Sequence, residues 1–225
     1  MGTKRPASLA STPRLLEPRD NGGMSRKLFV TTGADGRLVV THARPDSELD
    51  CDDPGQTRAA LVASDYRKRW GHTQVLDWFQ GQNEFWYLFD STPDGATDFT
   101  RPANRVVAAW GQSNPSNRVG DRRVLRRFPL PRVVGRSLDR GHLVAMASGG
   151  GENVNLVPQA TKLNRGRSEA GKRWRALERT CAQSSGAFLF VTVFYNDLSD
   201  TPADFEFRVQ VPGRVEIVEH FRNRD

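Results

Sequence analysis

The sequence has little cysteine and no long apolar run. Cys51 and Cys181 are its only cysteines, too few for a disulfide framework or for a zinc site with about four ligands. No stretch approaches the roughly 18 consecutive apolar residues of a transmembrane helix, and the first residues lack the apolar core of a secretory signal. There is also no internal repeat. These absences exclude a disulfide-stapled scaffold, a zinc ribbon, a repeat solenoid and a chain with a membrane span.

The composition is that of a folded protein. Hydrophobic residues make up 37% of the 225 residues, and 12 of these are Phe, which argues against a disordered chain. The length suits one domain that can bury a sizeable core without staples. Residues 1–25 are rich in Pro, Ser, Arg and Gly and are predicted to be a flexible tail. Residues 26–225 are then expected to form a single domain.

The first part of this domain is predicted to hold a hairpin and a helix. Asp35-Gly36 separates the β-rich runs 27–32 and 37–43, which is typical of a hairpin. Residues 56–70 favour a helix, and 75–79 are interpreted as its extension beyond Gly71. The inner face of this helix is expected to hold Ala60, Leu61 and Tyr66.

The rest of the chain reads mainly as strands. A helix is predicted within 168–183, and Cys181 on it is expected to be a small buried hydrophobe. A mostly antiparallel sheet with a few helices, an α+β fold, follows from this order of elements. The expected strands are 84–90, 105–111, 122–128, 187–196, 204–211 and 215–221.

Positive charge is concentrated in one part of the chain. Residues 101–179 hold 17 Lys and Arg against 5 Asp and Glu, a net charge of +12. The remainder holds 16 basic and 21 acidic residues, a net charge of −5. Such a field favours a polyanionic partner, because it concentrates that partner and supplies phosphate contacts. A merely solvated surface in a basic protein is the alternative interpretation.

Four short motifs lie within this basic region. They suit phosphodiester cleavage, because an imidazole can deprotonate water, amide oxygens suit a hard divalent cation, and arginines can hold phosphate oxygens. In chain order they are Asp139-Arg140-Gly141-His142, Asn155-Leu156-Val157-Pro158-Gln159, Leu163-Asn164-Arg165-Gly166 and Trp174-Arg175-Ala176-Leu177-Glu178.

These motifs resemble those of the DNA/RNA non-specific endonucleases of the ββα-metal (His-Me finger) class, most closely the compact bacterial branch often found as toxin domains. The motifs cover about a fifth of the chain, and a looser likeness extends from roughly Asn83 to Asn223. The resemblance implies a ββα-metal catalytic motif within a catalytic core of about 83–225. The hairpin and helix of 26–80 would then precede that core.

The resemblance assigns the chemistry to His142 and Asn164. His142 would be the general base, since an imidazole with a pKa near 6.5 is largely neutral at pH 7. Asn164 would be the only direct protein ligand of Mg²⁺ or another divalent cation such as Mn²⁺, with water filling the other positions. The ion would stabilise charge on the scissile phosphate and the leaving 3′ oxygen. Capping of the following helix is the structural alternative for Asn164.

Three further motif residues receive supporting roles from the resemblance. Asp139 would buttress the local structure, and Arg140 would lie near the substrate phosphate. Asn155 would hold the site in register, with a cap or turn role as the equal alternative. An upstream arginine would stabilise the pentacoordinate phosphate. The sequence does not choose among its candidates, which are Arg118, Arg122, Arg132 and Arg136.

Glu178 matches the family acid that orients metal-bound water, but its spacing departs from the family pattern. The family places this Glu about eight residues after the metal-binding Asn, whereas Glu178 follows Asn164 by 14 residues. On one unbroken helix this is roughly 21 Å, too far for one ion. We therefore expect a loop between Gly166 and Gly171, with the helix starting near Lys172.

Together these features predict a metal-dependent endonuclease acting on DNA, with RNA as an open second substrate. The toxin-type resemblance implies an acidic immunity protein as a partner and an effector role. Without a signal peptide, we expect the chain to work in the cytoplasm, or to leave by a specialised secretion route or within a longer polypeptide. Two alternatives stay open: a nucleic-acid-binding module without chemistry, and a domain acting mainly through its protein partner.

Overall fold

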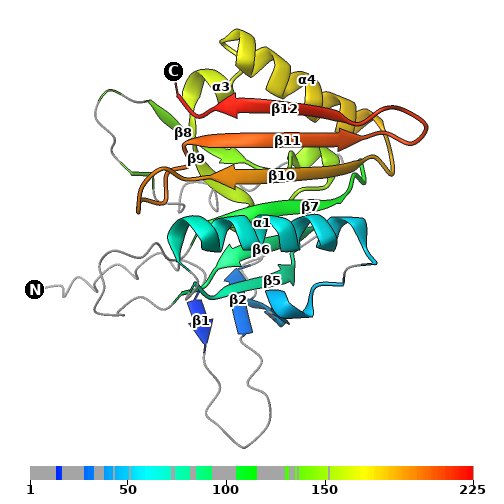
Figure 1. The fold of residues 1–225 in the computed structure, drawn as a ribbon. Helices are drawn as coiled ribbons and strands as arrows, with labels where there is room; N and C mark the ends of the chain where they lie inside the picture. Colours follow the sequence, from blue (N-terminus) through cyan, green and yellow to red (C-terminus); the bar gives the residue numbers. More distant parts are fainter. Residues whose placement is uncertain are drawn as a thin grey trace, which may run out of the picture.

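The computed structural model of the chain describes residues 14–16, 28–32, 38–42, 44–50, 52–71, 74–81, 85–92, 105–115, 130–131, 135, 137–151 and 153–224. Its largest element is a seven-stranded sheet in the order β12-β11-β10-β7-β6-β5-β4, and every pairing in it is antiparallel. The predicted α+β class is confirmed (Figure 1). The strands are β4 (Arg44–Pro45), β5 (Leu76–Gln80), β6 (Trp86–Asp90), β7 (Arg105–Gln112), β10 (Phe188–Phe194), β11 (Asp204–Gln210) and β12 (Ile217–Arg222).

One long helix packs on each face of this sheet. On one face, α4 (Glu169–Gln183) inserts Trp174, whose ring centroid lies 5.1 Å from those of Phe207 and Phe221. On the other face, α1 (Pro54–Trp70) places the Arg58 guanidinium over the Phe190 ring at 5.6 Å. Because side chains alternate along a strand and directly opposed residues share a face, the core is split into two layers (Figure 1).

A separate hairpin carries the first two motifs. It consists of β8 (Leu138–His142) and β9 (Leu156–Ala160), which pair antiparallel with each other. The short 3₁₀ helices η3 (Met146–Ser148) and η4 (Asn153–Asn155) lie in the connection between them. The chain continues directly into α3 (Thr161–Asn164) and then α4. Two strands followed by helices therefore form one continuous unit beside the main sheet.

The start of the described chain forms a third, small sheet. Strands β2 (Leu28–Thr32) and β3 (Leu38–His42) pair antiparallel, as the Asp-Gly turn predicted. Strand β1 (Arg14–Leu16) adds to β2, and η1 (Asp46–Glu48) follows. The other residues of the expected N-terminal tail lie outside the described residues.

Two local predictions for the first helix were wrong. Residues 75–79 do not extend α1, because Gly71 ends the helix with a φ of 112° and Leu76–Gln80 instead form β5. Leu61 is 64% exposed, and the buried face holds Gly55, Ala59, Ala63 and Tyr66. Tyr66 lies on the inner face as predicted, and Ala60 packs partly buried against the core, so Leu61 is the misplaced residue.

The remaining strands and the buried cysteine are as predicted. Each of 84–90, 105–111, 187–196, 204–211 and 215–221 contains an observed strand. Cys181 is a free, fully buried thiol on α4. The expected strand at 122–128 lies outside the described residues. None of the described helices combines the length and the apolar composition needed to cross a lipid bilayer.

Candidate active site

All four motifs fall on the unit formed by β8, β9, α3 and α4. Asp139 lies opposite Gln159 in the hairpin, and His142 lies opposite Leu156. The motif containing Asn164 ends α3, and the motif containing Glu178 lies in the middle of α4. The four motifs, which follow one another along the chain, therefore lie together on one compact arrangement of two strands and two helices.

Asn155 anchors the loop that follows β8. Its side chain is fully buried, and Oδ1 accepts a hydrogen bond from Val144 N at 2.8 Å. Nδ2 donates to the carbonyl oxygens of Val144 and Gly151, both at 2.7 Å. The same loop requires glycine at position 150, where a Cβ would lie 2.1 Å from the Val144 carbonyl oxygen. One amide side chain thus fixes the loop between the two strands.

Asp139 joins the hairpin to α3. Its carboxylate accepts a hydrogen bond from Asn164 Nδ2 at 3.2 Å and two from Arg165, both at 2.7 Å. Burial opposes ionisation of Asp139, but the hydrogen bonds from Arg165 and Asn164 outweigh it, so the pKa of Asp139 is lowered. Because Asn164 turns its nitrogen toward this carboxylate, its oxygen is left to face elsewhere. That is the atom a hard cation would bind.

His142 ends β8 in a largely buried position. Its Nε2 atom is inaccessible to solvent and has no hydrogen-bond partner among the described residues. Burial lowers the pKa of His142 to about 4, because a charged imidazolium is poorly solvated there. The ring is therefore neutral at pH 7, which is the form that can accept a proton from water.

Gly141 lets the two strands approach closely beside His142. A Cβ at Gly141 would lie 2.1 Å from Gln159 Oε1 and 2.6 Å from Gln159 Cβ. Gln159 is itself buried, and neither atom of its amide has a partner among the described residues. Sequence reasoning gave Gln159 no role. Its position in the motif was the available signal, but nothing in the sequence indicated that its amide would be buried and unpaired.

Glu178 is engaged inside the protein. Oε1 accepts a hydrogen bond from Trp174 Nε1 at 3.0 Å, and Oε2 pairs with Arg175 Nη1 at 2.8 Å. Burial raises the pKa of Glu178 despite the charge of Arg175. These contacts hold the carboxylate against its own helix.

The chain between Asn164 and Glu178 is broken into two helices, as the 14-residue spacing required. Gly166 has a φ of 68° between α3 and α4. Helix α4 begins at Glu169 rather than near Lys172, because Ser168 caps it by accepting a hydrogen bond from Gly171 N at 3.0 Å. The cap is therefore Ser168, and the alternative that Asn164 caps this helix is wrong.

The two helices cross where Gly171 leaves room. A Cβ at Gly171 would lie 2.4 Å from the Lys162 carbonyl oxygen and 2.9 Å from the Leu163 carbonyl oxygen. Both neighbours are backbone atoms of α3, and they cannot move away without moving Asn164. This crossing thus sets the position of the Asn164 amide relative to α4.

We expect Gly171→Ala to lower nuclease activity by about 100-fold, because a shift of about 1 Å in a catalytic group can cost that much. The same overpacking is expected to reduce the free energy of unfolding by roughly 1–3 kcal/mol. Cleavage of plasmid DNA and urea unfolding would measure the two effects. Ala176→Ser, at an exposed position of the same helix, is the matched control. Activity of Gly171→Ala equal to that of this control would show that the crossing does not position the site.

The donor atoms of the site suit a hard cation that keeps most of its water ligands better than a cation ligated on all sides by protein. Among the described residues, no three His, Cys, Asp or Glu side chains form a group that could hold a metal ion. The Asn164 amide oxygen beside Asp139 offers one neutral oxygen ligand. Mg²⁺ commonly keeps several waters and few protein ligands. The residues present therefore fit such an ion.

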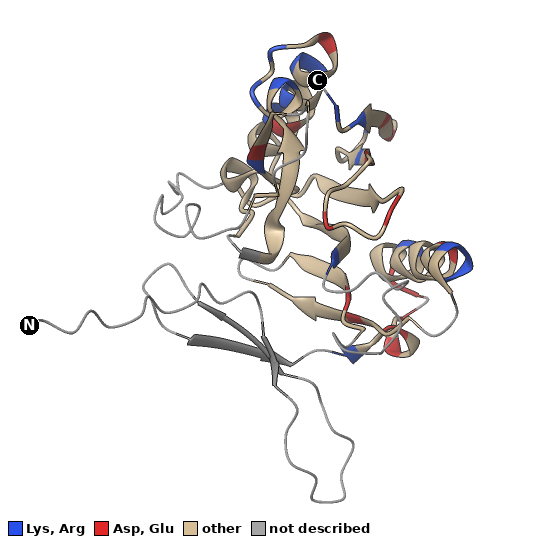
Figure 2. Cartoon of the chain, turned by 90° about the vertical axis from the view of Figure 1, so that its left-hand side faces the viewer, with Lys and Arg blue, Asp and Glu red and all other residues tan. Residues whose placement is uncertain are grey.

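Basic side chains surround this unit. Within 161–179 every Lys and Arg is exposed, and only Glu169 among the acidic residues is exposed with them. Figure 2 shows basic positions gathered along the helices of this unit. Sequence reasoning assigned no role to Arg165, although it holds Asp139. Arg140 is half-buried on β8. The four upstream arginine candidates lie outside the described residues. The basic residues of α3 and α4 and the loop between them are Lys162, Arg165, Arg167, Lys172, Arg173, Arg175 and Arg179.

The α+β fold contains an antiparallel hairpin followed by helices. A neutral His lies on the first strand of that hairpin, and an Asn follows the second. This arrangement is consistent with the ββα class of nucleases. The family described as DNA/RNA non-specific endonuclease matches residues 104–213. This match, which spans 110 of the 225 residues, supports the assignment of this part of the chain to that family. No curated protein matched the chain.

Proposed function

We propose that the chain is a metal-dependent endonuclease that hydrolyses phosphodiester bonds in DNA with little sequence preference, with RNA as an open second substrate. The observation that carries the proposal is the neutral, half-buried His142 at the end of a strand whose Asp139 holds the Asn164 amide. The match of residues 104–213 to the endonuclease family supports nuclease activity.

His142 is proposed to take a proton from a water molecule that attacks phosphorus in line with the leaving 3′ oxygen. The products are a 5′-phosphate and a 3′-hydroxyl. Asn164 would hold a divalent cation, Mg²⁺ or Mn²⁺, which when bound supplies positive charge beside the scissile phosphate. Arg140 and the basic residues of α3 and α4 would contact phosphate oxygens. Contacts to the backbone alone carry no sequence information, hence the weak sequence preference.

Asp139, Asn155 and Glu178 are proposed to position this machinery. Asp139 orients the Asn164 amide, and Asn155 fixes the loop after His142. Glu178 has both oxygens engaged by Trp174 and Arg175, which favours action through these neighbours. The exposed basic surface also supports a toxin role with an acidic immunity protein as partner, because such a partner would cover the same charges.

The proposal is tested by plasmid degradation with Mg²⁺ and with EDTA. EDTA is expected to abolish cleavage, and Asn164→Ala to lower it by about 1,000-fold, since metal-ion stabilisation of a phosphoryl transition state is worth several kcal/mol. Asn196→Ala, at an exposed site that bonds Arg69, is the control and should cleave normally. Full cleavage in EDTA, or by Asn164→Ala, would reject the metal role. Salt-dependent DNA binding without cleavage would favour the non-catalytic binding module instead.

A further inference from the structure

The α1 face of the main sheet carries aromatic and glutamine side chains far in sequence from the β8–β9 hairpin. Gln80 lies directly opposite Trp86, and Trp86 lies directly opposite Trp110. Because directly opposed residues of antiparallel strands share a face, these three side chains form a row across β5, β6 and β7. The Trp86 ring is held by Trp78, with ring centroids 4.9 Å apart.

The row continues across two further strands. Gln112 lies two residues beyond Trp110 on β7 and therefore on the same face. It is directly opposite Phe188 on β10, which is directly opposite Gln210 on β11. Three aromatic rings and three carboxamides thus lie on one face across five strands, a span of roughly 19 Å at the usual strand spacing.

The start of α1 closes this row into a cavity of about 540 Å³. Asp53, Pro54 and Gly55 form its remaining wall. Gly55 rests on the Trp110 indole, because a Cβ there would lie 2.6 Å from Trp110 Cδ1. The volume lies within the range of sites for small organic ligands.

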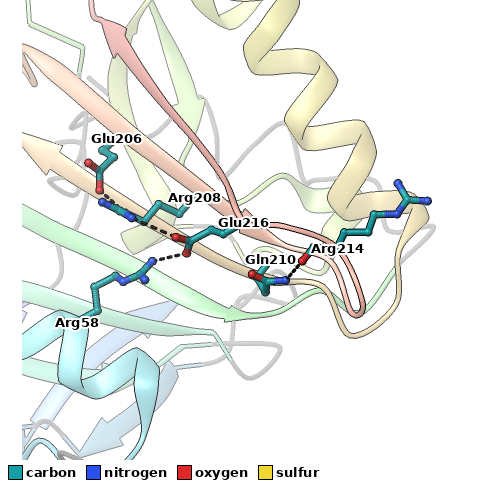
Figure 3. A network of polar contacts seen from close by, with 6 residues as sticks. All are labelled: Arg58, Glu206, Arg208, Gln210, Arg214 and Glu216. Carbon is teal, nitrogen blue, oxygen red and sulfur yellow. Dashed lines mark hydrogen bonds and ion pairs between the residues drawn. The ribbon is translucent and has the colours of Figure 1, made fainter.

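Apart from the Asp53 carboxylate, the polar side chains of the cavity are neutral amides that are partly unpaired. No described residue hydrogen-bonds with the side-chain amides of Gln80 or Gln112. Gln210 donates Nε2 to the carbonyl oxygens of Val211 and Arg214, which leaves its Oε1 as an acceptor (Figure 3). The Asp53 carboxylate accepts from Gln56 N as the cap of α1. Among the described residues that line the cavity there is no Lys or Arg, so it is not built for a phosphate group.

Arg58 on α1 and Arg208 on β11 are both paired with acidic side chains. Arg58 of α1 pairs with Glu216 at 2.8 Å, and Glu216 also pairs with Arg208 at 3.2 Å (Figure 3). Arg208 in turn pairs with Glu206 at 2.5 Å. This chain of ion pairs ties α1 to β11 and to the residue before β12. It therefore holds the wall of the cavity in place without presenting free charge to it.

We propose that this cavity binds a nucleobase. A flat heteroaromatic ring would lie against Trp86 and Phe188, and the glutamine amides would pair with its donor and acceptor edge, as Gln does with adenine. Aromatic side chains on a sheet face are a common platform for stacking unpaired bases. The choice of a nucleobase over other flat ligands rests on the proposed nuclease function. It adds a base-binding subsite on the opposite face of the sheet from α4.

The test uses the whole chain and free nucleosides, which contain no phosphodiester bond to cleave. Adenosine and cytidine are titrated by calorimetry and by saturation-transfer NMR, with methyl glucoside as the non-aromatic comparison. We expect nucleoside binding with a Kd near 1 mM or tighter. Trp86→Ala should weaken it at least about fivefold, and Gln112→Leu, at an exposed position, should also weaken it. Phe194 lies on the same face of β10 but lines a different pocket, so Phe194→Ala should leave nucleoside binding unchanged.

Equal binding of methyl glucoside, absence of nucleoside binding, or undiminished binding by both folded Trp86→Ala and Gln112→Leu would overturn the proposal. The two proposals also fail separately. Nucleoside binding by a chain that does not cleave DNA would remove the nuclease function and keep the subsite. Cleavage of DNA without nucleoside binding would remove the subsite and keep the nuclease function.

Discussion

Replacing His142 by alanine is expected to lower the rate of plasmid cleavage by about 100-fold to 10,000-fold, the usual contribution of a general base. The fold should persist, because His142 Nε2 makes no hydrogen bond to the described residues and its removal leaves no described partner unsatisfied. Circular dichroism and the midpoint of urea unfolding check this point. His220→Ala is the matched control, since His220 is an exposed His paired with Glu206. Wild-type activity of a folded His142→Ala would end the assignment of the base.

The acid limb of the pH profile gives an independent test of His142. The base works when deprotonated, and burial places its pKa at about 4, below the ordinary value of 6.5. We therefore expect kcat/KM to stay level from neutral pH downward and to fall only as pH approaches 4. The free energy of unfolding should decrease as the pH falls from about 6.5 to about 4, because in this range the unfolded chain binds a proton that the folded chain does not. An acid limb centred near 6.5 would contradict this burial.

Asn155→Ala is expected to have the largest effect on stability among the residues of the proposed site. It leaves Val144 N–H and the carbonyl oxygens of Val144 and Gly151 without their partner in a fully buried site. Each buried group left unpaired costs roughly 1–3 kcal/mol, so the free energy of unfolding should fall by about 4 kcal/mol. Urea unfolding followed by circular dichroism measures it.

Asn164→Ala supplies the contrast for Asn155→Ala. Asn164 is only half-buried, and Asn164→Ala removes one hydrogen bond, to Asp139. The free energy of unfolding of this variant should therefore fall by about 1 kcal/mol or less, while its nuclease activity is largely lost. A loss below about 1 kcal/mol in Asn155→Ala would show that the loop is held by other contacts. Similar stability losses in both variants would show that Asn164 is a structural residue.

Much of the candidate site was predictable because its residues are close in sequence. The hairpin places Asp139 opposite Gln159, and the helix follows at once, so local order alone puts four motifs on one unit. The need for a break between Asn164 and Glu178 was also predictable, since a helix has a fixed rise per residue. The start of α4 at Glu169 was missed, because the capping role of Ser168 was not recognised.

The sequence by itself determined the α+β class, most of the strands of the main sheet, the basic character of 101–179 and the set of motif residues. These features are set by periodicity, charge and spacing along the chain. Only the tertiary structure decided that His142 is half-buried and neutral, that Glu178 is held by Trp174 and Arg175, and that 76–80 form a strand. Burial, hydrogen-bond partners and strand pairing depend on residues distant in sequence, which no local pattern encodes.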